Sequence, residues 1–268
     1  MSHVVAIANQ KGGVGKTTTA VNLAASLAAA EHQVLLIDGD PQGNATSGLG
    51  LRRSDLHGTL YEVLIGQAAA TDAIHRSVHF SKLDVLPATT DLAGAEIELV
   101  GIESRELQFR EAVRTVRSHY DFVLVDCPPS LGLLTVNILA GSDAVLIPLQ
   151  CEYFALEGLS QLLQTVSLTQ VGLNESLTVI GVLLTMYDSR LNLSRQVAQE
   201  AREFFGSLVF NTVIPRNIRL AEAPSFGKPI LLYDIASAGA VAYMGTAKEL
   251  TSRMQTNVVP SAATIGSP

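Results

Sequence analysis

The sequence is short of several residue types, and each shortage narrows what the protein can be. Its 268 residues include no tryptophan and only two cysteines, Cys127 and Cys151, which lack metal-binding spacing and indicate a reducing compartment such as the cytoplasm. Only 16% of the residues are charged and 47% are hydrophobic, so we expect a well-buried core. No apolar run reaches the 18 residues of a membrane-spanning helix. The first predicted strand begins almost at Met1, so we expect no signal peptide and no N-terminal DNA-binding domain.

The first chemical signal is a glycine-rich loop at residues 10–18. It follows an apolar run at residues 4–8, which predicts a buried strand, and precedes an Ala/Leu-rich segment at residues 19–30, which predicts a helix. This order predicts a phosphate-binding loop in which Lys16 neutralises the β- and γ-phosphates and Thr17 binds Mg²⁺. The remaining nucleotide-binding residues predicted here are Gly12, Gly13, Val14, Gly15 and Thr18. A glycine-rich turn without a ligand is the alternative.

Two further apolar segments end in carboxylates. Residues 33–37 precede Asp38 and Asp40, which could bind the water shell of magnesium or position an attacking water, although a simple turn has the same composition. A second apolar run ends in Asp126, as in a Walker B strand whose carboxylate holds Mg²⁺ through water. Cys127, the next residue, could be a buried core residue or a cluster ligand, and we favour the core.

The rest of the chain alternates between predicted strands and helices. This alternation predicts one α/β domain over residues 1–255, with a doubly wound, mostly parallel sheet flanked by helices, as in P-loop NTPases. We expect residues 256–268 to be a disordered tail, since they are rich in Ser, Ala, Thr, Pro and Gly. Further strands are predicted at residues 83–88, 144–149, 179–185 and 209–214, and helices at 59–64, 68–75, 93–99, 105–119, 133–140, 156–171, 193–205 and 238–253.

Lys11 is an unusual residue in the loop, because it could lie on the surface or reach a phosphate, either its own or that of a neighbouring subunit. A glycine-rich loop flanked by two lysines resembles the deviant Walker A motif of the ParA/MinD family of dimeric ATPases. The resemblance implies that Lys11 crosses a dimer interface to the partner's nucleotide and that Asp40 assists hydrolysis. With Lys16 these are the predicted catalytic residues. Thr17, Asp38 and Asp126 are the predicted metal site, in which Asp38 has either a supporting magnesium role or a structural one.

Other segments extend the resemblance to chromosomal ParA of the Soj type. The matching segments are residues 10–19, 37–48, 126–130, 152–157, 185–188 and 214–229. Gly39 departs from the bulky residue usual in the family at that position. The resemblance implies that Glu152 approaches the nucleotide across the dimer and that Pro215 and Asn217 belong to the adenine-binding loop.

The same resemblance implies contacts with nonspecific double-stranded DNA, through Arg190 and Arg219 and, as weaker candidates, Arg216 and Lys228. The net charge of −7 opposes DNA binding, but residues 186–253 hold eight Lys and Arg against six Asp and Glu. Ordinary solvated surface charge is the alternative for each of these residues. The implied protein is a cytoplasmic, nucleoid-associated ATPase that uses ATP and Mg²⁺, dimerises and has a ParB-type centromere-binding partner. We expect weak activity alone, because no arginine finger is evident.

Several other functions share parts of this pattern. A MinD-like membrane-cycling ATPase would end in a basic amphipathic helix, whereas residues 258–263 are uncharged and interrupted by proline. An iron–sulfur ATPase of the nitrogenase reductase type would need cysteines from both subunits to meet, and Cys127 directly abuts Asp126. A related tyrosine kinase would carry a tyrosine-rich tail, but no tyrosine follows Tyr243. A DNA-binding module without ATPase activity would not require Lys16, Asp40 and Asp126.

Overall fold

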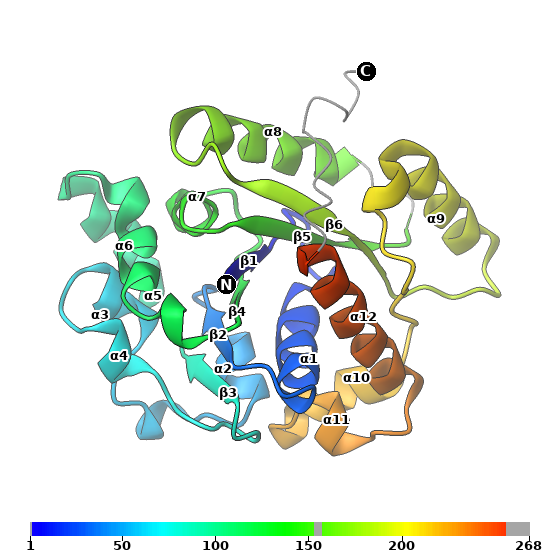
Figure 1. Ribbon diagram of the computed structural model, residues 1–268, viewed down its shortest axis with the longest axis horizontal. Coiled ribbons are helices and arrows are strands. Elements are labelled where there is room, and N and C mark those ends of the chain that lie inside the picture. The colour runs from blue at the N-terminus through cyan, green and yellow to red at the C-terminus, as the bar shows by residue number, and fades with distance from the viewer. Residues whose placement is uncertain (1, 153–156, 256–268) are drawn as a thin grey trace.

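The centre of the computed structural model, which describes residues 2–152 and 157–255, is a parallel sheet of six strands in the order β3-β2-β4-β1-β5-β6 (Figure 1). All of its strand pairs are parallel, which confirms the doubly wound sheet expected from the sequence. The strands are nearly continuous apolar runs, because helices cover both faces of the sheet. They are β1 His3–Ile7, β2 Val34–Asp38, β3 Leu83–Leu86, β4 Phe122–Asp126, β5 Ala144–Gln150 and β6 Thr178–Thr185.

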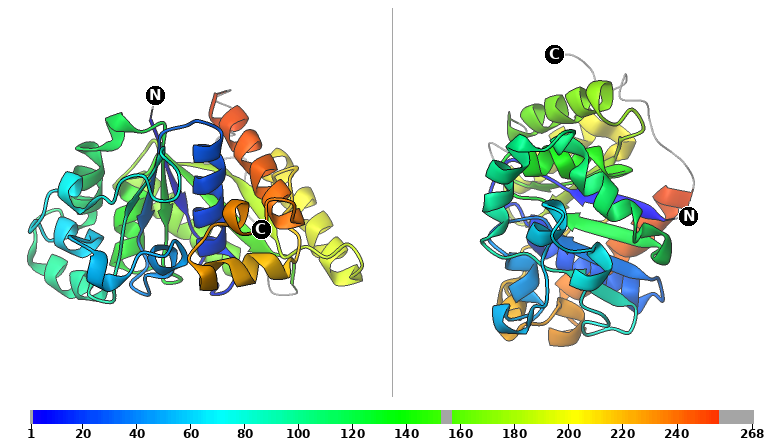
Figure 2. Two further views of the ribbon diagram at one scale, coloured as in Figure 1. Left: turned by 90° about the horizontal axis from the view of Figure 1, so that it is seen from below. Right: turned by 90° about the vertical axis from the view of Figure 1, so that its left-hand side faces the viewer.

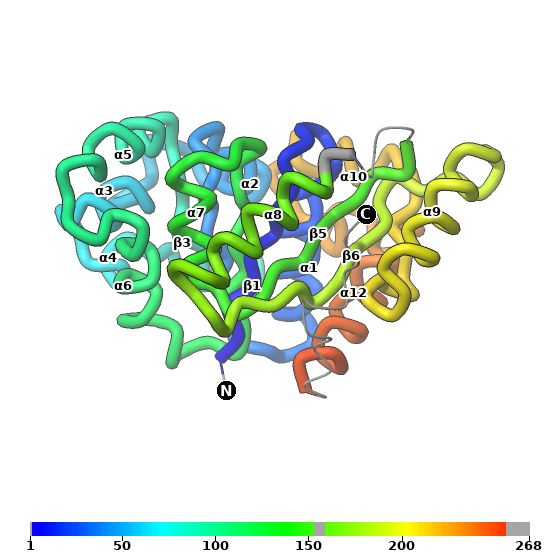
Figure 3. The backbone as a smooth tube through the Cα atoms, turned by 90° about the horizontal axis from the view of Figure 1, so that it is seen from above, coloured from blue at the N-terminus to red at the C-terminus, as the bar shows by residue number. Residues whose placement is uncertain are grey.

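The helices form two layers, each with its own hydrophobic cluster. One cluster joins α3 to α9 with one face of the sheet, and the other joins α1, α2 and α10 to α12 with the opposite face. Figure 3 views the molecule from the side covered by α7 and α8. The helices are α1 Lys16–Ala29, α2 Asn44–Gly48, α3 Leu60–Leu64, α4 Ala70–Ala73, α5 Leu92–Glu98, α6 Gln108–Arg114, α7 Leu133–Ala140, α8 Glu157–Gly172, α9 Asn192–Phe205, α10 Ile218–Glu222, α11 Ile230–Tyr233 and α12 Ala238–Gln255.

Helices α1 and α12, from opposite ends of the chain, lie side by side (Figures 1 and 2). The hydroxyl groups of Thr19 and Tyr243 form a buried hydrogen bond between them, 3.2 Å long. Asn22 of α1 also accepts a 2.7 Å hydrogen bond from the backbone N–H of Ile230. The C-terminal helices therefore hold in place the helix that begins at the glycine-rich loop.

The predicted strand at residues 209–214 is wrong. This segment runs beside β6, and the N–H groups of Phe210 and Ile214 donate to the Val182 and Leu184 carbonyls. The pairing is nevertheless limited to two isolated bridges, Val182 to Val209 and Tyr187 to Pro215, and does not form a continuous strand. Between these bridges, the backbone N–H groups of residues 211 and 212 donate to the carboxylate of Glu249 in α12. Since the N–H groups of residues 210 and 214 face β6, Glu249 takes the N–H of residue 212 that would have continued a seventh strand.

Two predicted helices are also shorter in the structure. Residues 105–119 form α6 with a short 3-10 turn on either side, Arg105–Leu107 and Arg117–His119, instead of one helix. The β-branched residues that follow α6 have low helix propensity. The predicted helix at residues 68–75 is reduced to α4, because the backbone of His75 pairs with Val85 of β3. The predicted tail at residues 256–268 lies outside the described residues.

Candidate nucleotide-binding site

The glycine-rich loop lies between the carboxyl end of β1 and α1, where ligands bind in open α/β sheets. Gly13 and Gly15 have φ values of 75° and 89°, a left-handed conformation that glycine adopts without steric cost. Neighbouring strands support the loop: the Thr185 hydroxyl of β6 donates to the Val14 carbonyl at 2.8 Å, and the Asn9 amide donates to a β5 carbonyl at 2.7 Å. The strand ends thus fix the curvature of the loop before any ligand binds.

Lys16 points into this loop. Its side-chain nitrogen donates to the Lys11 carbonyl at 3.1 Å, and the residue is only 6% exposed. Burial lowers the pKa of Lys16, while the nearby negative groups, chiefly Asp126, oppose that change. The ammonium group is therefore close to the loop N–H groups, where a phosphate would need it.

Asp126 is the last residue of β4 and is completely buried. Neither carboxylate oxygen has a hydrogen-bond partner among residues 2–152 and 157–255. Burial raises the pKa of Asp126 well above its usual value and the charge of Asp38 adds to this, whereas the neighbouring Thr17 and Lys16 lower it. A buried, unpartnered carboxylate costs free energy unless a ligand compensates it. Together with the Thr17 hydroxyl, this donor set fits a hydrated magnesium ion.

Asp38 lies beside Asp126 in the register of β2 and β4, but its carboxylate is already engaged. It accepts hydrogen bonds from the backbone N–H and the hydroxyl of Thr46, at 2.8 and 2.7 Å, and from the N–H of Asp40 at 3.2 Å. Burial raises the pKa of Asp38 to about 6. This geometry supports the structural role considered for Asp38, and its magnesium role stays a prediction.

Asp40 is buried at the start of the following turn, where its carboxylate accepts a 2.9 Å hydrogen bond from the N–H of Gln42. The residue before it, Gly39, stands where the family usually has a bulky residue, and in this chain the neighbouring atoms leave no room for a side chain. A Cβ atom there would lie 2.7 Å from the Asp126 carbonyl and 2.6 Å from the Ile138 side chain. The absence of a side chain lets the Asp40 turn pack directly on the end of β4.

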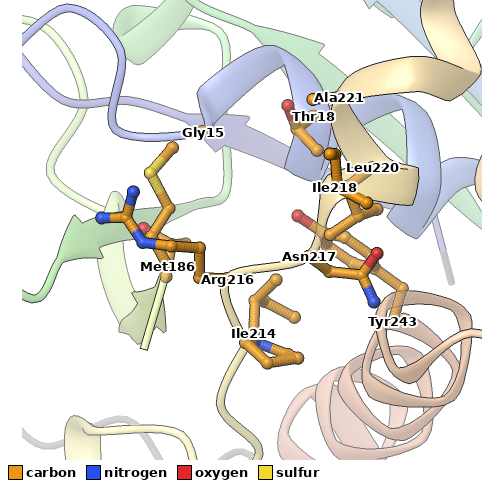
Figure 4. Close-up of a pocket in the computed structure, with 12 residues that line it drawn as sticks. Gly15, Thr18, Met186, Ile214, Arg216, Asn217, Ile218, Leu220, Ala221 and Tyr243 are labelled. Carbon is orange, nitrogen blue, oxygen red and sulfur yellow. The ribbon is translucent and has the colours of Figure 1, made fainter. Parts of the chain in front are cut away.

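A pocket of ≈ 420 Å³ opens beside the loop (Figure 4). Gly15 and Thr18 line it near the loop, and the predicted residues Pro215 and Asn217 line it farther away. The walls are mostly apolar, as a planar base requires, and the Asn217 side-chain oxygen caps α10 by accepting from the N–H of Arg219 at 2.8 Å.

Sequence reasoning missed most of the apolar lining of this pocket, including Met186 and Tyr243. Figure 4 shows Met186 together with Arg216 on one side and Tyr243 on the other. Met186 has a φ of 51°, an unusual left-handed conformation for a residue with a side chain. Tyr243 comes from α12, more than 200 residues from the loop, so only the tertiary structure reveals its position.

Lys11, Glu152 and Arg216 meet at the entrance to the site. The Glu152 carboxylate lies 3.8 Å from the Lys11 ammonium and 3.7 Å from the Arg216 guanidinium. The Gln150 amide also donates to Glu152 at 2.5 Å. The structure thus brings together three residues that the sequence placed in separate motifs, and within one subunit Lys11 faces Glu152.

The predicted DNA-binding residues lie in separate segments. Arg190 lies in the loop between β6 and α9, and its side chain is 86% exposed. Arg219 belongs to α10, Arg216 lines the pocket, and Lys228 is exposed in the segment before α11. Both Arg190 and Arg219 are ion-paired with carboxylates of the same subunit.

Comparison with known proteins identifies the family. A family model described as an AAA domain matches residues 2–179. The chain is 56% identical over 252 residues to the sporulation initiation inhibitor protein Soj of Bacillus subtilis strain 168, covering 94% of this chain and 99% of that protein. It is 54% identical over 253 residues to the chromosome partitioning protein ParA of Myxococcus xanthus strain DK1622, covering 94% and 89%. The chain belongs to the ParA/Soj family.

Membership in the ParA/Soj family confirms the resemblance found in the sequence motifs. A crystal structure described as cobyrinic acid a,c-diamide synthase of Mycobacterium smegmatis, with bound ADP and magnesium, has a TM-score of 0.83 and 38% identity, over 96% of this chain and 97% of that one. Since this identity is lower than that of the ParA/Soj relatives, the synthase supports the fold more than a shared reaction. In the described residues, no helix combines the length and apolar character needed to cross a membrane.

Proposed function

We propose that this protein is a partition ATPase that hydrolyses ATP to ADP and phosphate with the help of Mg²⁺. The observation that carries the proposal is Asp126, whose buried carboxylate has no hydrogen-bond partner in the described chain and faces Thr17 and Lys16. An ATPase site needs such a carboxylate to hold magnesium. A turn with only a structural role has nothing to offset the free-energy cost of burying an unpartnered carboxylate.

The parts of the site suggest how the nucleotide lies. The base occupies the pocket lined by Pro215 and Asn217, and the phosphates lie against the N–H groups of residues 12–18. Lys16 compensates phosphate charge, and Asp40 orients the attacking water. Magnesium, held by Thr17 and Asp126, would neutralise charge that develops on the phosphates.

A dimer would give Lys11 and Glu152 a role at the entrance of the site. Both are partly exposed at the entrance of the site, where a second subunit could present its nucleotide. In the proposed dimer, each Lys11 reaches the phosphates of the opposite subunit, so ATP bridges the two chains and loss of the γ-phosphate removes the bridge. Nucleotide state thereby controls assembly.

The dimer is proposed to bind double-stranded DNA nonspecifically through Arg190 and Arg219, with Arg216 and Lys228 contributing. Doubling the basic residues raises affinity steeply, because each neutralised phosphate releases counterions. A ParB-type partner would accelerate the slow intrinsic hydrolysis and return the protein to its monomer. This cycle implies a cytoplasmic, nucleoid-associated protein.

The test is binding to random-sequence duplex DNA with ATP, with ADP and without nucleotide, across a salt series. We expect binding that requires ATP, weakens with salt and disappears in Arg219→Glu. A protein that hydrolyses ATP but binds no DNA in any state would refute the partition proposal. A parallel measurement with anionic lipid vesicles would instead reveal a MinD-like membrane cycle.

A further inference from the structure

The two arginines assigned to DNA are both held by carboxylates of their own subunit. The Asp188 carboxylate accepts hydrogen bonds from Nε and Nη2 of Arg190, at 2.9 and 2.7 Å, and from its backbone N–H at 3.0 Å. These two side-chain groups form the planar fork with which arginine binds a phosphate. Asp188 therefore occupies one of the two edges with which Arg190 could bind a phosphate in this way.

Arg219 is restrained in a similar way. Its Nη1 group donates to Glu222 at 2.9 Å, and its Nε group lies 3.5 Å from the carboxylate of Asp234. Tyr233 also donates to Glu222, at 2.9 Å, and so helps to orient that carboxylate. The arginine thus has a carboxylate on each of two sides.

The charge balance of these groups opposes DNA binding. Arg190 with Asp188 carries no net charge, and Arg219 with Glu222 and Asp234 carries one net negative charge. A single subunit therefore presents no positive charge at the two positions assigned to DNA. A phosphate that binds either arginine through these engaged groups must displace a carboxylate, which then remains next to the DNA.

We propose that Asp188 and Glu222 set the DNA affinity of this protein by competing with phosphate for Arg190 and Arg219. The proposal rests on the DNA-binding role of these arginines described above. The competition keeps a single subunit below the affinity needed to stay on DNA, so that only the dimer, with two copies of each arginine, binds well. It makes the two carboxylates affinity-determining residues of the DNA surface.

The test uses Asp188→Asn and Glu222→Gln in the full chain, with random-sequence duplex DNA and with ATP, ADP or no nucleotide. Exposed ion pairs are weak, so each freed arginine should raise affinity ~2- to 5-fold, and the two copies in a dimer should raise it ~4- to 25-fold. The salt dependence should steepen by up to about 0.9 in logarithmic slope per arginine. In the wild type, the carboxylate released when the arginine moves to a phosphate takes up a cation, and the amide of the variant does not.

The matched control is Glu175→Gln. Glu175 is an exposed residue in the segment before β6, so this substitution removes the same charge at a position far from both arginines along the chain. A gain in the two variants and not in this control supports the proposal. A second measurement is a double-mutant cycle: competition predicts that Asp188→Asn raises affinity less in an Arg190→Ala background than in the wild type, whereas equal gains in both backgrounds would mean that the carboxylate only repels the DNA. Equal affinities for the wild type, both variants and the control would overturn the inference while leaving DNA binding intact. Absence of DNA binding by every form with ATP would overturn the proposed function itself.

Discussion

Asp38 and Asp126 are paired neighbours at the ends of β2 and β4, yet only Asp38 has hydrogen-bond partners among the described residues. The Thr46 backbone and hydroxyl stabilise the first carboxylate, and the second faces Lys16 and Thr17. Two residues that look alike in the sequence therefore differ in what they can do, because one maintains a turn and the other is available to a cation.

Asp126→Asn should separate stability from activity. Replacing an unpartnered buried carboxylate by a neutral amide should raise the nucleotide-free stability at pH 7.5 by about 1–3 kcal/mol. Because the folded pKa is raised, the advantage of the variant should shrink as pH falls through that pKa toward the usual aspartate value. Thermal unfolding in EDTA measures this, and hydrolysis with magnesium should be lost. A variant that is less stable at pH 7.5 would contradict our interpretation of the carboxylate.

Lys11→Ala should abolish assembly and leave nucleotide binding intact. The residue lies at the entrance to the site and is paired only weakly, at 3.8 Å, with Glu152, so its removal should not disturb the fold. Sedimentation with a non-hydrolysable ATP analogue should give a dimer for the wild type and a monomer for the variant. Lys82→Ala, which removes a lysine paired with Glu31 at 2.8 Å, is the control and should still dimerise. A dimeric Lys11 variant would remove the proposed bridging role.

Glu249 should make stability dependent on pH below neutrality. Burial raises its pKa, but hydrogen bonds from the N–H groups of Thr212 and Asn211 and from Arg253 outweigh this, so the net pKa is lowered. Its contribution is therefore present above the ordinary glutamate pKa of 4.5 and is lost as pH falls through the folded value. Urea unfolding should show Glu249→Gln to be less stable than the wild type at pH 7, with a difference that shrinks below pH 4.5. A difference independent of pH would exclude an ionic contribution.

Gly227→Ala should destabilise the fold more than Gly66→Ala. Both glycines have positive φ, 62° and 75°, but a Cβ atom at Gly227 would lie 2.7 Å from the Cα of Gly50, whereas Gly66 has open space. The conformational penalty alone is about 1 kcal/mol, and the backbone clash should add about 1–3 kcal/mol at Gly227. Unfolding free energies of the two variants check this. Equal losses would mean that the contact between Gly227 and Gly50 relaxes at no cost.

Much of the fold and of the candidate site could be predicted because the sequence patterns that indicate them lie within short segments of the chain. The loop at residues 10–18 contains its own glycines, lysines and flanking strand and helix, and apolar runs identify all six strands of the described sheet. The failure at residues 209–214 has a tertiary cause. Their apolar pattern is typical of a strand, but the Glu249 carboxylate accepts hydrogen bonds from two of their backbone N–H groups. Glu249 lies more than 30 residues away, so the sequence around residues 209–214 does not indicate this contact.

The sequence by itself determined the glycine-rich loop, the parallel sheet and the carboxylates at the strand ends, since each depends on the order of residues along a short segment. Only the tertiary structure decided that Asp38 is engaged and Asp126 is not, that Tyr243 reaches the pocket, and that carboxylates hold both Arg190 and Arg219. The physical reason is that electrostatic energies depend on distance and burial, and both are set by packing between segments that are remote in sequence.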